Sequence, residues 1–127
     1  MNGKKWMQRF IEMHGHQPRA LVTGGSSGMG LEYARQLAVM GCNLLLVSNQ
    51  ENELLKASEA LKRDGIQVKT RFQDLAQDRS ADVLFAYCQN EHLQIDILVN
   101  NAGMFFFEEL TPENEAKALM MMRLHAF

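Results

Sequence analysis

Cysteine and proline are scarce in this chain, with two of each among its 127 residues. Cys42 and Cys88 show neither a CxxC motif nor the spacing of metal ligands. We therefore expect small buried apolar side chains in a reducing compartment, with a disulfide as the alternative. His14 and His16 lie close together, but two histidines without a third ligand do not make a metal centre. The sequence thus predicts no metal site.

The chain also lacks a basic excess and a long apolar run. Thirteen Lys and Arg residues against fifteen Asp and Glu give a formal net charge of −2, which provides no broad positive field for nucleic acid. No apolar stretch approaches the ~18 residues of a membrane-spanning helix. Gln8, Arg9 and Glu12 interrupt the amino-terminal segment, which is unlike a secretory signal. We therefore expect a cytoplasmic protein without a membrane or nucleic-acid partner.

What the sequence does contain is a regular alternation of apolar patterns. Apolar residues make up 46% and charged residues 22%, as in ordinary globular proteins. We expect a helical extension over residues 1–17 and one domain over residues 18–127. In the helix over residues 51–63, Leu54, Leu55 and Leu61 are expected to face the core. The pattern predicts helices over 3–14, 28–40, 51–63, 78–91 and from Thr111 onward, and strands over 19–24, 43–48, 66–72 and 95–100.

This order of elements is typical of an α/β protein, in which helices cover both faces of a parallel sheet. Its most informative stretch runs from Leu21 to Leu31, where an apolar run meets a glycine-rich turn and then a helical pattern. Gly24, Gly28 and Gly30 allow a tight turn, a close approach of the backbone to phosphate, and close helix packing. Helix N-termini bind phosphate groups through free backbone N–H groups. The stretch therefore predicts a site for the pyrophosphate of a dinucleotide.

Further motifs follow in register with this turn. Together with the turn itself, they lie at or just after the ends of predicted strands: Thr23-Gly24-x-x-x-Gly28-x-Gly30, Asp74, and Asn100-Asn101-Ala102-Gly103. From about residue 18 to the end, the chain closely resembles the classical short-chain dehydrogenases/reductases. Extended members would have glycine in place of Ser27. The resemblance implies a Rossmann-like, doubly wound parallel sheet with strand order 3-2-1-4, truncated after the fourth βα unit. It also implies NAD(P)-dependent hydride transfer to or from an alcohol or carbonyl substrate.

The resemblance also assigns roles to individual residues. Asp74 would accept a hydrogen bond from the adenine amino group, and Leu75 would pack against the ring. Asn100 would brace the sheet. Without the resemblance, Asp74 would be interpreted as a helix N-cap or a loop carboxylate. The complete set of implied cofactor-binding residues is Thr23, Gly24, Ser26, Ser27, Gly28, Met29, Gly30, Asn49, Asp74, Leu75, Asn100, Asn101, Ala102 and Gly103.

The end of the second predicted strand bears on the choice of cofactor. In the family, an acidic residue there selects NAD, whereas basic residues bind the 2′-phosphate of NADP. This chain has the neutral residues Ser48, Asn49 and Gln50 at that place. No carboxylate repels a phosphate, which favours NADP. The neutral side chains give little attraction for phosphate, so NAD stays open.

The resemblance fails at the catalytic residues. Family members transfer the proton with a Tyr-x-x-x-Lys pair. Here Tyr33 and Tyr87 are followed four residues later by Leu37 and Glu91. We therefore expect the chain to correspond to the amino-terminal half of the family fold and to be inactive alone. His125, which aligns with a proton-relaying asparagine of the family, is the one catalytic candidate, and a frayed terminal residue without a role is the alternative.

Three interpretations remain open: the cofactor-binding part of an oxidoreductase, a non-catalytic dinucleotide-binding module, and a degenerate fragment. The last predicted strand carries Ile95, Ile97 and Val99 at an open edge of the sheet, and such an edge recruits other chains. The sequence therefore predicts a homo-oligomer joined through this strand or through the helix after Thr111.

Overall fold

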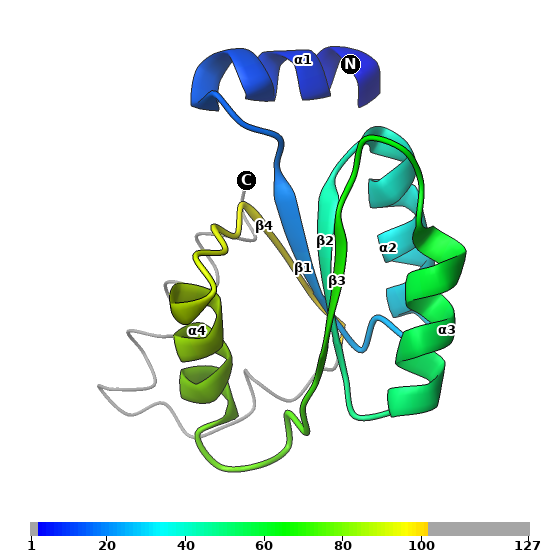
Figure 1. The fold of residues 1–127 in the computed structure, drawn as a ribbon, viewed down its shortest axis with the longest axis vertical. Coiled ribbons are helices and arrows are strands. Elements are labelled where there is room, and N and C mark those ends of the chain that lie inside the picture. Colours follow the sequence, from blue (N-terminus) through cyan, green and yellow to red (C-terminus); the bar gives the residue numbers. More distant parts are fainter. Residues whose placement is uncertain (1–2, 102–127) are drawn as a thin grey trace.

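The computed structural model describes residues 3–101, in which helices and strands alternate along the chain (Figure 1). The strands form one parallel, four-stranded sheet with the order β3-β2-β1-β4. The predicted α/β class and strand order are therefore confirmed. The elements are α1 Gly3–His14, β1 Arg19–Thr23, α2 Gly28–Met40, β2 Asn43–Ser48, α3 Glu51–Leu61, β3 Val68–Phe72, α4 Ser80–Asn90 and β4 Ile97–Asn100.

β2 lies inside the sheet because its residues are apolar on both sides. Leu44, Leu45, Leu46 and Val47 are all completely buried, as expected for a strand covered on both faces. Successive side chains point to opposite faces. Leu44 and Leu46 thus belong to one core cluster, and Leu45 and Val47 to another.

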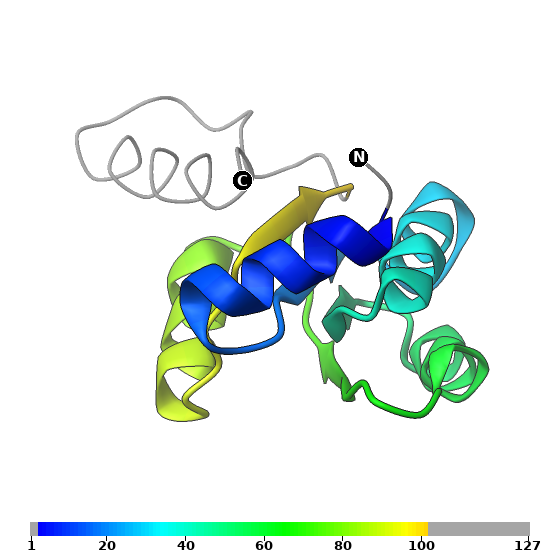
Figure 2. The same cartoon turned by 90° about the horizontal axis from the view of Figure 1, so that it is seen from above.

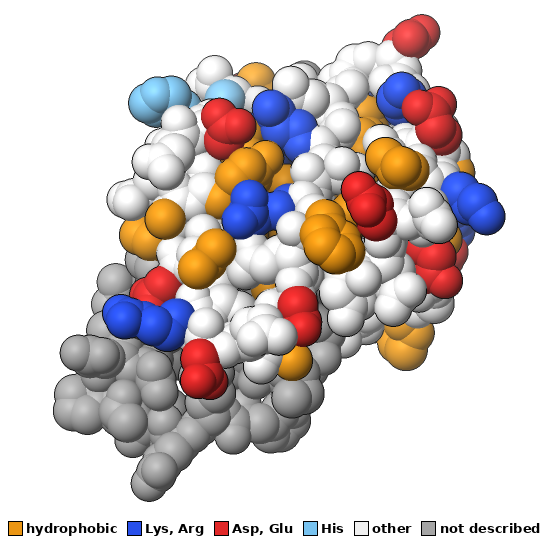
Figure 3. Space-filling model, turned by 60° about the horizontal axis from the view of Figure 1, so that its bottom comes forward, with side chains coloured by type: hydrophobic (Ala, Val, Ile, Leu, Met, Phe, Trp, Pro, Cys, Tyr) orange, Lys and Arg blue, Asp and Glu red, His pale blue; other side chains and the backbone are white. Residues whose placement is uncertain are grey.

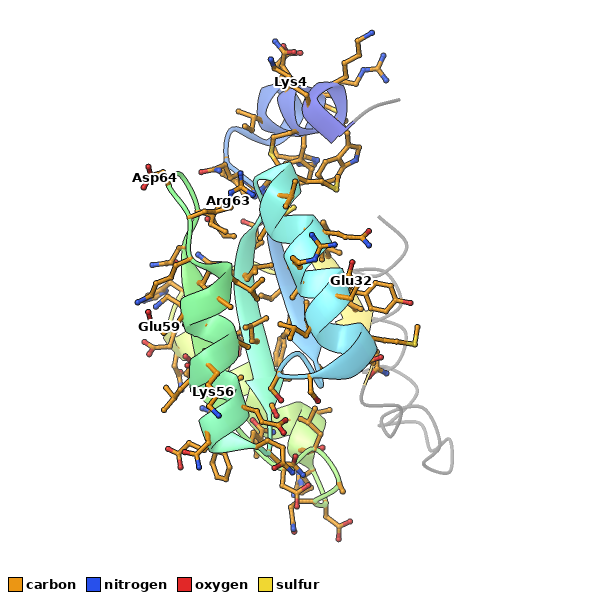
Figure 4. All side chains as sticks on the ribbon, turned by 90° about the vertical axis from the view of Figure 1, so that its right-hand side faces the viewer. Lys4, Glu32, Lys56, Glu59, Arg63 and Asp64 are labelled. Atoms are coloured by element: carbon orange, nitrogen blue, oxygen red, sulfur yellow. The ribbon has the colours of Figure 1, made fainter. Side chains whose placement is uncertain are left out.

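Helices cover the two faces of the sheet. α2 and α3 lie on one face and α4 lies on the other (Figures 1 and 2). Charged side chains of α2 and α3, such as Glu32, Lys56 and Glu59, point away from the sheet into solvent (Figure 4). The sheet is therefore doubly wound, and its loops gather at its two ends.

The carboxyl ends of three strands are in register. Thr23, the last residue of β1, pairs with Val47 of β2 and with Asn100 of β4. In open parallel sheets, ligands bind outside this end of the strands, at the point where the strand order reverses. That point lies between β1 and β4.

α1 lies across the opposite end of the sheet, near the amino-terminal ends of the strands (Figure 1). None of its residues is fully buried. Trp6 and Phe10 form a ring pair with centroids 5.7 Å apart, and His16, just after the helix, lies 3.4 Å from the Asp96 carboxylate. The predicted helix is present, and its separation from the domain as residues 1–17 stays a prediction.

The structure corrects the predicted inner face of α3. Leu54 is 2% exposed and Leu61 is buried, whereas Leu55 is 57% exposed. Adjacent residues on a helix point about 100° apart. Only one residue of a Leu-Leu pair can face the core squarely, so the expectation for Leu55 was wrong.

Two strands begin later than predicted, and side-chain hydrogen bonds explain both differences. β3 begins at Val68 rather than at 66, because the N–H of Gln67 donates to Asn43 Oδ1 at 2.8 Å. β4 begins at Ile97 rather than at 95, because the Asp96 carboxylate accepts the N–H of Arg19 at 3.0 Å. In each case a side-chain oxygen, in place of a backbone carbonyl of the neighbouring strand, accepts the N–H.

Cys42 and Cys88 are free and buried, as expected. Burial raises the pKa of the Cys42 thiol to about 12 and raises that of Cys88 as well. Between residues 3 and 101, no cluster of His, Cys, Asp or Glu could hold a metal ion. In the same range, no helix has the length and apolar character to cross a membrane.

Candidate cofactor-binding site

The turn between β1 and α2 depends on two glycines in the left-handed region. Gly24 has φ 64° and Gly28 has φ 55°, a conformation that glycine adopts without steric cost. Between them, Ser27 is extended at the N-cap of α2, with φ −159° and ψ 169°. The chain therefore turns sharply at the carboxyl end of the sheet.

The first amides of α2 have no partner inside the helix. The Ser27 side chain makes no capping hydrogen bond, and Leu31 donates to the Ser27 carbonyl at 3.2 Å. The N–H groups of Gly28, Met29 and Gly30 precede that bond, and such groups have no intrahelical acceptor. Ser27, Gly28 and Met29 are exposed. Free amides and the positive end of the helix dipole together favour an anion here.

Gly30 lies where the start of α2 crosses the turn and the end of β4. A Cβ atom at this position would overlap the Gly24 carbonyl oxygen and lie 2.8 Å from Nδ2 of Asn101. The backbone conformation of Gly30 is ordinary, so the constraint is space alone. Any side chain larger than hydrogen would push the helix away from the turn.

Thr23 ties the end of β1 to the end of β4. Its buried hydroxyl donates to Oδ1 of Asn100 at 3.0 Å and accepts the N–H of Asn101 at 2.9 Å. Thr23 and Asn100 thus brace the crevice between β1 and β4 from within. The bracing role that the family resemblance assigns to Asn100 stays a prediction.

A cleft of about 250 Å³ lies at the carboxyl ends of β1, β2 and β3. Figure 3 turns this end of the molecule toward the viewer and shows acidic, basic and hydrophobic side chains interspersed on its surface. The cleft contains four of the predicted cofactor residues and three that were not in the predicted set. Its lining is Gly24, Ser48, Asn49, Gln73, Asp74, Leu75 and Ala76.

Ser48 joins three loops around this cleft. Its hydroxyl lies 2.7 Å from that of Ser26 and accepts the N–H of Gln50 at 3.0 Å. The Ser48 carbonyl accepts the N–H of Gln73 at 3.0 Å. The buried Ser26 hydroxyl is therefore bonded to Ser48 and does not point outward. Ser26 acts here on the shape of the turn.

Asp74 has the geometry of a loop carboxylate. Oδ1 accepts the N–H of Ala76 at 2.9 Å, and Oδ2 accepts the side-chain amide of Gln77 at 3.1 Å. These bonds, the one from Ala76 first, hold the pKa of Asp74 below its ordinary value. An ionised carboxylate has further lone pairs, so Asp74 can still accept a bond from a ligand in the cleft.

Other predicted residues differ in how far they are open to a ligand. Asn49 is exposed at the cleft, whereas Leu75 is 8% exposed and packs mainly in the core beneath α4. Ala102, Gly103 and His125 lie outside the described residues. Sequence reasoning missed Gln73 and named Ser48 only for the choice of cofactor, although both residues end or directly follow a strand. Position at a strand end was the signal that could have identified them.

Known proteins share both the sequence pattern and this fold. The family model described as short chain dehydrogenase matches residues 18–127. The very-long-chain 3-oxoacyl-CoA reductase of Neurospora crassa is 40% identical over 86 residues, which are 66% of this chain and 26% of that protein. The D-beta-hydroxybutyrate dehydrogenase of Cupriavidus necator is 36% identical over 85 residues, 67% of this chain and 33% of that protein.

Solved structures give the same result. L-sorbose reductase from Gluconobacter frateurii, in complex with NADPH and L-sorbose, has a TM-score of 0.64 and 29% identity, covering 84% of this chain and 45% of that one. Menthone neomenthol reductase from Mentha piperita has a TM-score of 0.59 and 34% identity, covering 68% and 31%. The chain spans about a quarter to a third of the curated relatives named above. Its match to the family model over residues 18–127, together with the geometry of its glycine turn, shows that it belongs to the short-chain dehydrogenase family.

Proposed function

We propose that this chain is the NAD(P)-binding part of an oxidoreductase that transfers hydride between a nicotinamide and an alcohol or carbonyl substrate. The observation that carries the proposal is the open amino end of α2 beside the cleft at the ends of β1, β2 and β3. Free amides suit a pyrophosphate, and the adjoining cleft suits an adenosine. When bound, the nicotinamide supplies the hydride.

The residues present fit such a cofactor. The packing at Gly30 leaves the start of α2 close to the turn, where a Cβ atom would separate them. Gly28 and Met29 would hold the pyrophosphate through their amides, and Asp74 would hold the adenine amino group. Asn101 and the following residues would line the riboses. These roles are inferred for this chain from its family.

For the choice of cofactor, we propose a preference for NADP. Ser48 and Asn49 place no carboxylate in the cleft. Glu51 and Glu53, in the first turn of α3, oppose a 2′-phosphate, so we expect NADPH to bind at most a few times more tightly than NADH.

Calorimetric titration with NADPH and NADH tests the function. We expect saturable binding of both in the micromolar range. Asp74→Asn should weaken both by about tenfold, because one charge-assisted hydrogen bond is worth roughly 1.5 kcal/mol or more. Asp78→Asn, an exposed carboxylate in the same loop, is the matched control. Absence of saturable binding, or an equal loss in both variants, would contradict the proposal.

Catalysis by this chain alone is not part of the proposal. The sequence has no Tyr-x-x-x-Lys, since Leu37 and Glu91 stand four residues after its two tyrosines. This observation favours a second candidate, a non-catalytic dinucleotide-binding module. A degenerate fragment would bind neither cofactor, so the same titrations separate it from the two cofactor-binding interpretations. The catalytic role of His125 and the cytoplasmic location stay predictions.

We also propose self-association through β4. Within residues 3–101, β4 is an edge strand that pairs only with β1, and half-buried Ile97 and Val99 lie on it. The edge strand of an open sheet can recruit another chain. Sedimentation at tens of micromolar should therefore show a dimer or larger species, and a monomer at that concentration would contradict the proposal.

A further inference from the structure

We propose that Gln73 is a positioning residue that fixes the wall of the cleft against which the adenine half of the cofactor binds. This wall, residues 73–79, is the loop between β3 and α4. The inference rests on the proposed function, and it concerns how the wall keeps its shape. Asp74 and Leu75 carry the family roles, while Gln73 acts through them.

Gln73 bonds to three different parts of the fold. Its N–H donates to the Ser48 carbonyl at 3.0 Å, which extends the pairing of β2 and β3 by one bond. Its side-chain Nε2 donates to the Ser80 carbonyl at 2.8 Å. Its Oε1 accepts Nε of Arg71 at 2.7 Å. Both ends of the amide are thus used, and the side chain has one orientation.

The Arg71 partner is itself fixed. Its guanidinium lies over the ring of Tyr87, 4.2 Å from the centroid, and cation–π contacts of this kind hold a planar guanidinium in place. Tyr87 belongs to α4 and packs against the core on that face. Gln73 is therefore joined through Arg71 to α4 as well as directly to Ser80.

The far end of the wall is closed by Ser80. Its buried hydroxyl donates to the Leu75 carbonyl at 2.8 Å. Ser80 is thus bonded both to Gln73 and to Leu75. Asp74 lies between these two residues in the sequence. Removing the Gln73 amide would break the first of these two bonds and loosen the chain at Asp74, while the bond from Ser80 would still hold Leu75. The first amides of α2 lie on a different loop and would stay in place.

The same strand pair offers a matched control at the other end of the sheet. Gln67, just before β3, also accepts an arginine, Arg19 Nη2, at 2.6 Å. Gln67 is exposed and does not line the cleft. Gln67→Leu and Gln73→Leu therefore make the same chemical change and break the same kind of bond, but only Gln73 lies at the cleft.

The test measures two probes on the 127-residue chain by calorimetric titration: ADP, which needs the cleft, and inorganic pyrophosphate, which needs only the α2 amides. Gln73→Leu should weaken ADP binding by about tenfold or more and leave pyrophosphate binding unchanged. Gln67→Leu should change neither. Gln73→Glu keeps the acceptor for Arg71 but loses the donor to Ser80, so its ADP affinity should fall between those of wild type and Gln73→Leu.

Several results would overturn the inference. Unchanged ADP binding in Gln73→Leu would do so, as would equal losses for ADP and pyrophosphate, which indicate a general loss of structure. If Gln73→Leu shows no cooperative thermal unfolding, Gln73→Glu takes its place under the same criteria. If the wild-type chain binds neither ADP nor NADPH, the proposed function fails and this inference fails with it. Wild-type binding with an unaffected Gln73 variant removes only the inference.

Discussion

Replacing Gly30 by alanine is expected to abolish saturable NADPH binding and to lower the free energy of unfolding by about 3 kcal/mol, the upper part of the range for overpacking. The added Cβ atom would meet the Gly24 carbonyl and the Asn101 amide. The first of these is backbone, which cannot move aside as a flexible side chain can. The start of α2 would have to shift, and its free amides would leave the position that suits a pyrophosphate.

Gly65→Ala serves as the control for Gly30→Ala. Gly65 has φ 86°, and no atom lies within 4 Å of a Cβ built there. Its replacement costs only the left-handed conformation, about 1–2 kcal/mol, and should leave NADPH affinity unchanged. Urea unfolding and calorimetric titration measure both quantities. A Gly30→Ala protein that binds NADPH like wild type would show that the crossing at Gly30 is not needed for the site.

Leu54→Ala should destabilise the protein by about 2–5 kcal/mol, whereas Leu55→Ala should cost less than about 0.5 kcal/mol. The two residues are neighbours on α3, and they differ in being 2% and 57% exposed. Truncating Leu54 leaves a cavity between α3 and the sheet. Truncating Leu55 only removes surface that already meets water.

Denaturant midpoints at constant slope separate these two leucine variants. Equal losses would mean that α3 is rotated relative to the arrangement described above. A larger loss for Leu55 would mean that Leu55 and not Leu54 faces the sheet, whereas the sequence pattern places both leucines there.

The fold was predictable because its strongest signals are local. Residues 43–48 are a continuous apolar run, and a glycine follows directly on the strand that ends at Thr23. The helix closed by Gly41, with φ 98° at its C-cap, is equally local. Apolar periodicity places such elements well, but it does not decide which of two adjacent leucines faces inward or which side chain replaces a ladder bond.

The candidate site was predictable only in part. The glycine turn and the residues after β3 and β4 follow from motif and position. The bonds of Ser48 with Ser26 and of Gln73 with Ser80 link residues that are distant in sequence or brought back by a loop. No periodicity encodes them. Asp74 keeps two interpretations, a loop carboxylate and a ligand-binding residue, because its bonds within the loop leave lone pairs that a ligand can use.

The hydrogen bonds of the Thr23 hydroxyl limit which amino acids can occupy the last position of β1. The Thr23 hydroxyl donates a hydrogen bond to the Asn100 side chain and accepts one from the backbone N–H of Asn101. Asn100 Oδ1 only accepts and an amide N–H only donates, so the group between them must do both in very little space. Among residues of this size, serine alone could replace threonine without leaving one neighbour unpaired. Valine, its equal in shape, would fill the same volume but leave both Asn100 Oδ1 and the Asn101 N–H without this partner.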